Sequence, residues 1–565
     1  MDPGPSSSPA LAVRDLRFRY RARENQALDG VSFEVEKGQM IVLLGPSGAG
    51  KSTLCLALNG LIPHFSRGTM EGEVTVFGTS TRHRSVAELA NQVGLVFQDF
   101  EAQLFATNVA LEVAFGLENF GVDRPTMEAR VAATLALVGL SGLEHREPAS
   151  LSGGQKQRLA IAAVLALHPR ILVMDEPTTD LDPAGSIDVL RVARQLRDEG
   201  RTLVVAEHEI EALTGVDRVL VLNRGRIEAV GSPDQILTRA GWLERRGIQP
   251  PGAAHLLELL GEPPVLDVER ATTQLRSRGY HVPDDTWSAL TTDPDPILRA
   301  GPPLLRLSGV GHRYPGGVEA LAEVELELHA GEFVGIVGAN GSGKTTLIKH
   351  LNGLLEPTSG QVYLEDRPTR GMGVRELGLT VGYVFQSPDH QLFAESVREE
   401  VAFALRNHGL DGIEDRVDEA LKAVGLAERD DEDPFTMTKG ERQRVAVASV
   451  LATRPRIIVL DEPTTGLDYG EQRRMMELVA RLNREGRTIL CVTHSMWVVA
   501  EYARRTVVLA EGRIVADGPT RQVFGDETLL ERARLRAPQV VEMTRALGRP
   551  LLSVAEAARC LVREE

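Results

Sequence analysis

The chain has 565 residues, of which 42% are hydrophobic, and a formal net charge of −16. This composition predicts a globular protein with two or more cores, and the acidic balance disfavours a nucleic-acid partner, which would require a basic face. Three scattered cysteines argue against a disulfide framework and fit a reducing compartment, and no stretch has the length and apolarity of a membrane span or signal peptide.

The first half of the chain leads into a glycine-rich loop. A Pro/Ser-rich tail at 1–10 is predicted to be disordered, and alternating apolar residues predict strands at 11–20 and 27–35. The apolar run 40–44 then enters the pattern G-x-x-x-x-G-K-[ST], whose backbone N–H groups and following helix N-terminus attract phosphate. The residues predicted to bind nucleotide phosphates are Gly45, Pro46, Ser47, Gly48, Ala49, Gly50, Lys51, Ser52 and Thr53.

Polar side chains end the buried strands that follow. Apolar strands predicted at 93–98, 171–175 and 202–208 carry, at or just after their ends, Gln98, Asp175 with Glu176, and His208. Residues 99–150 are rich in Ala, Leu and Glu at helical spacing, which predicts a helical insertion. A second anion-binding loop opens the next helix, with Ser152, Gly153, Gly154 and Gln155.

The second half repeats this order. Lys344 follows Lys51 by 293 residues, and Gln98, Glu176 and His208 recur as Gln386, Glu462 and His494, at offsets of 288, 286 and 286 residues. Such a nearly constant offset predicts two copies of one nucleotide-binding unit. The repeated loops comprise Gly338, Ala339, Asn340, Gly341, Ser342, Gly343, Lys344, Thr345 and Thr346, and then Thr438, Lys439, Gly440 and Glu441.

These residues have the chemistry of ATP hydrolysis, because the carboxyl ends of parallel strands meet at one edge of a sheet. Magnesium ligands are predicted in each half: Ser52, Gln98 and Asp175, then Thr345, Gln386 and Asp461. Catalytic roles, orienting the attacking water and contacting the γ-phosphate, are predicted for Glu176, His208, Glu462 and His494. Tyr20 and Tyr314 either stack on an adenine ring or are half-buried strand aromatics.

Both halves resemble ATP-binding-cassette (ABC) ATPases, with a Walker A loop, Q-loop glutamine, signature loop, Walker B Asp-Glu, D-loop and switch histidine in each. The resemblance implies an α/β fold of two P-loop NTPase domains, each with a RecA-like core and a helical subdomain. It also implies that the halves pair head to tail within one chain around two ATP sites. Lys51 would then share ATP with 438–441, and Lys344 with 152–155.

A narrower resemblance concerns a second glutamine after each Q-loop. The sequences around Gln103 and Gln391, and the tail at 535–548, are similar to those of the ATPases of energy-coupling-factor (ECF) importers. That family implies a transmembrane coupling protein and a small substrate-binding membrane protein as partners, and a peripheral location on the cytoplasmic face of the membrane. The transported substrate, a vitamin or a transition metal, would contact another chain and is left open.

One loop departs from the family pattern. The second signature loop has Thr438 for Ser and Lys439 for Gly, which adds a charge and a side chain where backbone approaches phosphate. Either the loop is a tolerated variant, or the Lys51 site turns over more slowly than the Lys344 site.

The domain boundaries follow from the repeat and from Pro-rich sequence between the halves. The predicted parts are a first ABC domain at 11–245, a helical tail and linker at 246–303, a second ABC domain at 304–522, and a C-terminal helical tail at 523–565. Two other functions remain open: a fused ATPase of a sugar-type importer, and a soluble ABC protein acting on ribosomes. The stretch 235–303 has 7 Arg and Lys against 9 Asp and Glu, which disfavours the basic arm that a ribosomal protein would carry.

Overall fold

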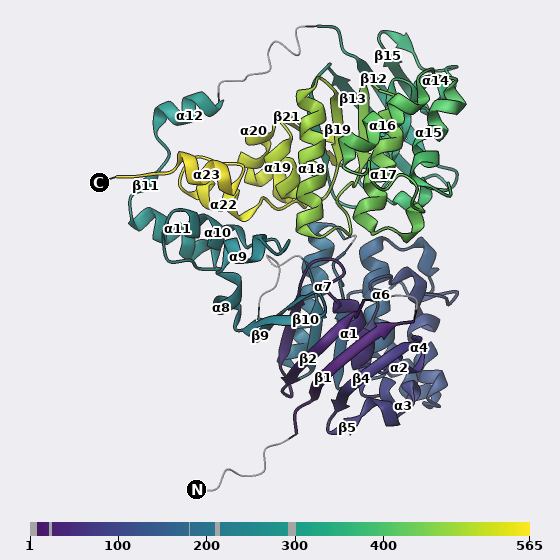
Figure 1. Cartoon of the computed structure of the whole chain (residues 1–565), viewed down its shortest axis with the longest axis vertical. Coiled ribbons are helices and arrows are strands. Elements are labelled where there is room, and N and C mark those ends of the chain that lie inside the picture. Colours follow the sequence, from purple (N-terminus) through teal and green to yellow (C-terminus); the bar gives the residue numbers. More distant parts are fainter. Residues whose placement is uncertain (1–7, 22–24, 180, 209–214, 292–300, 565) are drawn as a thin grey trace. The chain divides into compact units, whose positions relative to one another are not determined.

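The computed structural model describes residues 8–21, 25–179, 181–208, 215–291 and 301–564. The chain divides into two compact units, the first made of nearly all residues up to Glu258 and the second of nearly all residues from Asp267 onward (Figure 1). Residues 1–7 of the predicted disordered tail lie outside the described part. Ala10, assigned to that tail, is instead fully buried in the core with Leu11 and Val35, and its N–H donates to the carbonyl of Val35 at 2.8 Å.

The first unit contains two sheets. An antiparallel sheet has the order β2-β1-β4-β5, with β1 Leu11–Tyr20, β2 Leu28–Val35, β4 Gly68–Val76 and β5 Thr79–Ser80. A second sheet has the order β10-β9-β3-β8-β7-β6 and is parallel except for the hairpin β9–β10. Its strands are β3 Met40–Leu44, β6 Val93–Val96, β7 Ile171–Asp175, β8 Thr202–Ala206, β9 Arg218–Asn223 and β10 Arg226–Gly231.

Alternation along β3 explains the layers of this unit. Met40, Val42 and Leu44 belong to a core shared with the helical insertion, whereas Ile41 and Leu43 belong to a core shared with the antiparallel sheet. A strand with apolar residues on both faces is covered on both sides, so all five side chains of β3 are buried. The helices are α1 Lys51–Leu58, α2 Leu61–His64, α3 Val86–Ala90, α4 Val109–Asn119, α5 Arg124–Leu137, α6 Gly153–Leu165, α7 Pro183–Asp198, α8 Pro233–Leu237, α9 Ala240–Glu244 and α10 Gly252–Leu259.

The second unit repeats this architecture. Its antiparallel sheet has the order β13-β12-β15-β16, and its mainly parallel sheet the order β17-β18-β19-β14-β20-β21. The strands are β12 Leu305–Arg313, β13 Glu319–Leu328, β14 Phe333–Val337, β15 Ser359–Leu364, β16 Arg367–Pro368, β17 Val381–Val384, β18 Ile457–Asp461, β19 Thr488–Val492, β20 Arg505–Ala510 and β21 Arg513–Pro519. The helices are α13 Lys344–Leu351, α14 Val374–Gly378, α15 Val397–His408, α16 Ile413–Val424, α17 Lys439–Ala452, α18 Tyr469–Arg484, α19 Met496–Tyr502, α20 Thr520–Gly525 and α21 Glu527–Arg532.

Much of the stretch predicted as a linker is folded onto the C-terminal tail of the second unit. Helix α11 (Val268–Ser277) packs against α22 (Gln539–Ala546), and the two-residue strand β11 (Tyr280–His281) pairs antiparallel with β22 (Val562–Arg563). Arg549 donates to the carbonyl of Val282 at 2.9 Å, and its guanidinium lies 5.6 Å from the ring of Trp287 on α12 (Asp284–Thr291). Between α22 and β22 the tail also contains α23 (Val554–Cys560). Residues 268–291 therefore form part of the second unit.

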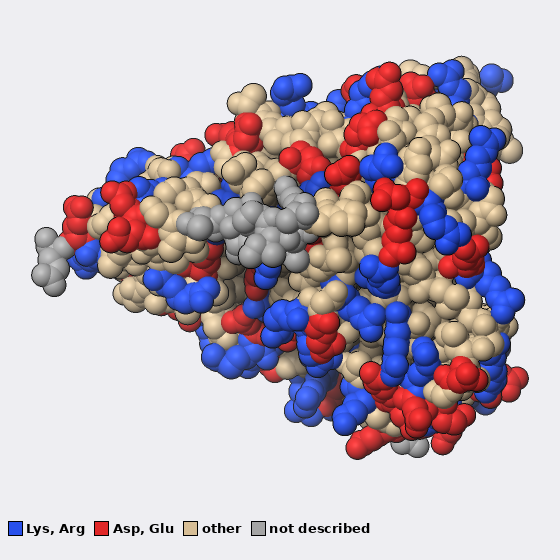
Figure 2. Space-filling view, turned by 90° about the horizontal axis from the view of Figure 1, so that it is seen from above, with Lys and Arg blue, Asp and Glu red and all other residues tan. Residues whose placement is uncertain are grey.

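Two properties of the surface bear on partners. In the view of Figure 2, acidic and basic side chains are intermingled, without a broad face of one sign. Within the described ranges, no helix is both long enough and apolar enough to cross a bilayer.

Candidate functional site

The glycine-rich loop of each unit joins the central strand to a helix. In the first unit β3 leads into α1, and Gly50 at the N-cap has a φ of 104°, where an added Cβ would lie 2.5 Å from the carbonyl oxygen of Ala27. Only glycine fits this close approach. The buried ammonium of Lys51 donates back to the carbonyls of Gly45 at 2.9 Å and Pro46 at 3.3 Å. The Lys51 ammonium is therefore held over the phosphate loop, two of whose backbone carbonyls it contacts.

The second unit has the same loop geometry. Gly343 has a φ of 103° and an added Cβ there would lie 2.4 Å from the carbonyl oxygen of Ala320. The Lys344 ammonium donates to the carbonyls of Gly338 at 2.8 Å and Ala339 at 3.1 Å. Both predicted phosphate loops thus present a buried lysine at the carboxyl end of a central parallel strand.

Three predicted site residues of the first unit lie around the carboxylate of a fourth, Glu176. The Gln98 amide donates to Glu176 Oε2 at 2.7 Å, His208 Nε2 lies 2.7 Å from Glu176 Oε1, and Lys51 Nζ lies 3.5 Å from the same oxygen. Burial would raise the pKa of Glu176, but the hydrogen bond and charge of His208, with the charge of Lys51, outweigh it and lower the pKa to about 2. Glu176 is therefore held ionised, as a group that orients or deprotonates a water must be.

Asp175 has the opposite electrostatics although it is the preceding residue. Burial raises its pKa to about 6, against a hydrogen bond from Ser52 that favours the ionised form. Its Oδ1 is buried and has no hydrogen-bond partner among the described residues. A buried, unpartnered carboxylate oxygen beside a hydroxyl is a suitable donor set for Mg²⁺, so Asp175 and Ser52 fit the predicted ion, whereas the Gln98 amide donates to Glu176 and its role as a ligand stays a prediction. When bound, Mg²⁺ would neutralise phosphate charge there.

The corresponding residues of the second unit differ in detail. His494 Nδ1 lies 2.9 Å from Glu462 Oε2, and its backbone N–H donates to the same oxygen at 3.2 Å. Burial would raise the pKa of Glu462, but the charge and hydrogen bonds of His494 outweigh it and lower the pKa. Gln98 and Gln386 are both exposed, but among the described residues only Gln98 hydrogen-bonds to the glutamate of its unit.

Tyr383 is a site residue that the sequence reasoning missed. Its hydroxyl donates to Asp461 Oδ2 at 2.8 Å, while Asp461 Oδ1 is buried without a partner among the described residues. Burial raises the pKa of Asp461 to about 6, and the Tyr383 hydrogen bond opposes this rise. The first unit has Leu95 at the equivalent position of β6. Tyr383 lies on β17, beside the strand that ends in Asp461, and this neighbourhood is set by the strand order rather than by a local sequence pattern.

The two candidate adenine-stacking tyrosines contact the loop helices through their hydroxyls. Tyr20 OH lies 3.2 Å from Thr53 Oγ1, and Tyr314 OH lies 3.1 Å from Thr346 Oγ1. Each threonine is the last residue of its phosphate loop and lies in the first turn of the following helix. Both tyrosine rings therefore lie beside the phosphate loops. Stacking of these rings on an adenine base stays a prediction.

Each predicted signature loop begins a helix with a capping box. Ser152 accepts from the N–H of Gln155, and Gln155 accepts from the N–H of Ser152; Thr438 and Glu441 form the same reciprocal pair. In the second loop Glu441 is also paired with Arg429.

Lys439 makes a contact within its own unit that the sequence reasoning missed. Its side chain lies against Gly466, where an added Cβ would collide with the Lys439 ammonium. At the equivalent positions of the first half the sequence has Gly153 and Asp180. Lys439 therefore contacts a loop of its own unit.

Comparisons with known proteins identify the family. The family model described as ABC transporter matches residues 28–179 and 321–465, more than half of the chain. A relative from Caldanaerobacter subterraneus subsp. tengcongensis, named as an ABC transporter ATP-binding protein, is 46% identical over 99% of this chain and 100% of its own. One of the same name from Methanosarcina acetivorans is 40% identical over 95% and 90%. The solved structure of CbiO1 from Clostridium perfringens, described as part of the ABC transporter complex CbiONQ, is 35% identical with a TM-score of 0.38, over 42% of this chain and 98% of its own.

These matches confirm the α/β fold class and the duplicated ATPase predicted from the sequence. Both halves carry the family's motifs, and the relatives match nearly the whole chain rather than one half. ATP is accordingly the nucleotide of both sites, and its hydrolysis is coupled to transport. The chain belongs to the family of ABC transporter ATP-binding proteins, as a tandem ATPase with two ABC domains.

Proposed function

We propose that this chain is the ATP-hydrolysing subunit of an ECF-type importer for a vitamin or a transition metal. It acts on the cytoplasmic face of the membrane with a transmembrane coupling protein and a small substrate-binding membrane protein. ATP binding brings the two halves together, and hydrolysis, with Mg²⁺ bound, lets them separate. The groups that contact ATP favour the closed state only while the γ-phosphate is present. Each ATP is shared between the Walker residues of one half and the signature loop of the other.

The glutamine after each Q-loop supports the ECF assignment. Gln103 accepts from the N–H of Phe97 at 3.3 Å, and Gln391 accepts from the N–H of Phe385 at 3.3 Å. The Gln391 amide also donates to Ala446 and Ser449 on α17, at 3.0 and 2.9 Å. These glutamines brace the chain between the ATP site and the helical subdomain, which suits a segment that transmits movement to a partner.

The observation that carries the proposal is an exposed aromatic pair repeated in both helical subdomains. Phe105 and Phe115 are 62% and 44% exposed with ring centroids 4.5 Å apart. Phe393 and Phe403 are 55% and 43% exposed with centroids 4.4 Å apart. Exposed aromatics that already contact each other lose little freedom on binding, and such residues dominate protein–protein interfaces.

Each pair is held by a buried carboxylate. Glu112 Oε2 accepts from the N–H groups of Phe105 and Ala106 at 2.9 and 2.7 Å. Glu400 Oε2 accepts from the N–H groups of Phe393 and Ala394, both at 2.8 Å. Both glutamates are 3% exposed. Two equally built anchors, one per half, suit a single membrane protein that offers one docking element to each half.

The proposal is tested by substituting one ring of each pair, Phe105→Ala with Phe393→Ala, and purifying the complex from membranes. Loss of the two rings should weaken association with the coupling protein by at least about thirtyfold, since even one such aromatic anchor contributes about 2 kcal/mol or more. Basal ATP hydrolysis should persist, because neither ring contacts the ATP-site residues. Phe65→Ala, which removes a ring that is 75% exposed outside the helical subdomains, is the matched control. Full retention of the membrane partner by the double variant would contradict the proposal.

A further inference from the structure

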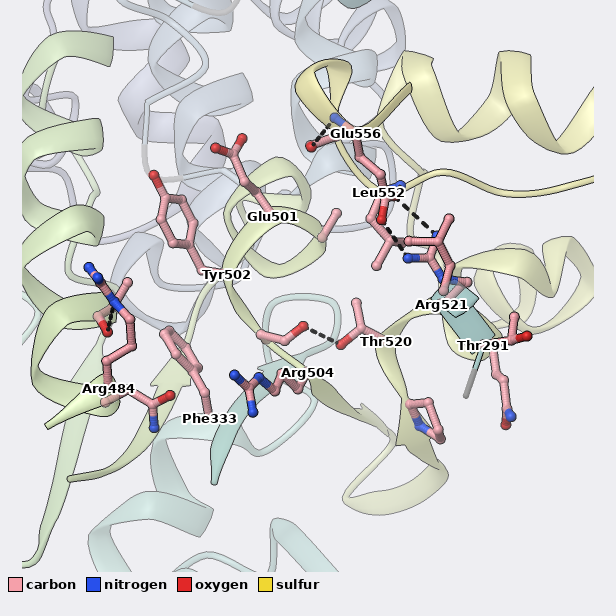
Figure 3. Close-up of a pocket in the computed structure, with 18 of the residues that line it drawn as sticks. Thr291, Phe333, Arg484, Glu501, Tyr502, Arg504, Thr520, Arg521, Leu552 and Glu556 are labelled. Atoms are coloured by element: carbon pink, nitrogen blue, oxygen red, sulfur yellow. Dashed lines mark hydrogen bonds and ion pairs between the residues drawn. The ribbon is translucent and has the colours of Figure 1, made fainter. Parts of the chain in front are cut away.

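The second unit contains a cavity away from the phosphate loop. It has a volume of about 540 Å³, within the range of small-molecule sites. Its walls come from the C-terminal ends of α18 and α19, the start of α20, helix α23, and the end of α12 (Figure 3). The cavity is thus lined by three segments that are far apart in sequence. These are the end of the stretch predicted as a linker, the second ABC domain and the C-terminal tail.

The cavity lies at the opposite end of the sheet from ATP. Its lining includes Phe333, the first residue of β14, whereas the phosphate loop begins after the last residue of that strand, Val337. A strand of five residues extends roughly 16 Å, so the two ends are separated by more than the length of a triphosphate group. A ligand in the cavity is therefore distinct from the ATP that is hydrolysed.

The lining is cationic in a chain whose net charge is −16. Four arginines line it, Arg484, Arg504, Arg521 and Arg559, against two glutamates, Glu501 and Glu556. Both glutamates are already neutralised: Arg521 pairs with Glu556 at 2.6 Å, and Glu501 pairs with Arg473 at 3.1 Å. The pairs leave an excess of positive charge facing the cavity.

Two of these guanidinium groups are available to a ligand. Arg484 and Arg559 are exposed, and neither has a carboxylate within 4 Å among the described residues. Each side chain only donates, through Nε, to a carbonyl of its own helix, Ala480 at 3.4 Å and Ala555 at 3.2 Å. Their terminal N–H groups therefore have no acceptor among the described side chains. The guanidinium fork matches the oxygens of a phosphate.

The cavity also has an aromatic and apolar part. Figure 3 shows the ring of Phe333 between the side chains of Arg484 and Arg504, with Tyr502 above them. Phe333 is buried, so its ring forms part of the floor. Leu552 adds an aliphatic side chain on the side of Arg521. A ligand with an anionic group and a flat apolar group would match both parts.

We propose that this cavity is a binding site for a small organic phosphate, separate from both ATP sites. The phosphate contacts an exposed guanidinium group of the lining, Arg484 or Arg559, and the organic part lies over Phe333 and Tyr502. The paired residues Arg521 and Glu556 form a fixed wall, since their side chains are only 14% and 15% exposed.

Phenyl phosphate is the probe for this site, titrated calorimetrically into the full chain saturated with a non-hydrolysable ATP analogue. One molecule should bind per chain with a dissociation constant of about 10 μM to 1 mM, which is typical of a compact ligand with one charged group. The double variant Arg484→Glu with Arg559→Glu should weaken binding by at least about tenfold. The control, Arg370→Glu with Arg532→Glu, changes two exposed arginines outside the cavity by the same total charge and should bind normally.

Two results would overturn the proposal: no heat of binding up to about 10 mM probe, or equal loss of binding in the control variant. If the charge reversal affects folding, the variant Arg484→Gln with Arg559→Gln gives the same test without added negative charge. It should also weaken binding by several fold, and unchanged affinity there would equally count against the site.

Discussion

Asp175 is expected to destabilise the fold that contains it. Its pKa of about 6 lies above the ordinary value of 3.8, because burial disfavours the ionised carboxylate. The folded state therefore holds this proton more tightly than the unfolded state. The resulting penalty is absent below about pH 4, develops as the pH rises to about 6, and is complete above that. At 1.36 kcal/mol per pKa unit the full penalty is about 3 kcal/mol.

The substitution Asp175→Asn removes this titration while it keeps the shape of the side chain. The amide has its own packing cost, but that cost does not change with pH, so the pH dependence isolates the carboxylate. Relative to wild type, the variant should gain about 1.4 kcal/mol of unfolding free energy between pH 5 and pH 7.5. The same variant should lose ATP hydrolysis, which makes Asp175 a case of stability given up for function.

Urea unfolding of the full chain, without Mg²⁺ or nucleotide, measures this difference. Mg²⁺ must be left out because a bound cation would lower the pKa of the Asp175 carboxylate, and nucleotide must be left out because it carries Mg²⁺ into the site. Asp461→Asn is the matched substitution in the second unit, where the pKa of the aspartate is also about 6. A stability difference that stays constant with pH, or that falls as the pH rises, would refute this explanation of the buried aspartates.

Three further outcomes are expected. Glu176→Gln and Glu462→Gln should reduce ATP hydrolysis to different extents, because the halves carry different signature loops; equal losses would argue for equivalent sites. Tyr383→Phe should raise the Mg²⁺ concentration for half-maximal hydrolysis by about tenfold, as expected when a carboxylate loses a hydrogen bond of about 1.5 kcal/mol, and an unchanged requirement would mean that the hydroxyl does not position Asp461. Arg549→Ala should lower the calorimetric melting temperature of the second unit by about 2–4 °C, because the tail loses its contacts with 282–287. An unshifted transition would mean that these contacts do not stabilise the unit.

The sequence predicted best what is encoded locally. A glycine loop after an apolar strand, and polar residues at strand ends, follow from patterns within a few residues, and the parallel sheet then brings Lys51, Gln98, Glu176 and His208 together. The constant offset between the halves added the duplicated fold, since each element of the first half predicts its counterpart.

Contacts between distant segments were beyond the reach of those patterns. The pairing of β11 with β22 joins residues about 280 positions apart, and two-residue strands carry no periodic signal. Likewise, no local pattern marks Tyr383 as a site residue, because its partner Asp461 lies on the neighbouring strand. Lys439 was treated as an intrusion into a phosphate loop, whereas its side chain lies against Gly466 of the same unit.

The central claim is that ATP hydrolysis by this chain powers uptake through a membrane partner. Its most direct test is to isolate the chain with its native membrane partners, reconstitute the complex in vesicles, and measure ATP-dependent uptake of labelled vitamins and of cobalt and nickel. We predict that a coupling protein and a small membrane protein co-purify, that one of these substrates accumulates only with ATP, and that Glu176→Gln with Glu462→Gln abolishes the accumulation. Isolation with ribosomes and without a membrane protein, or uptake that the double variant leaves intact, would contradict the claim.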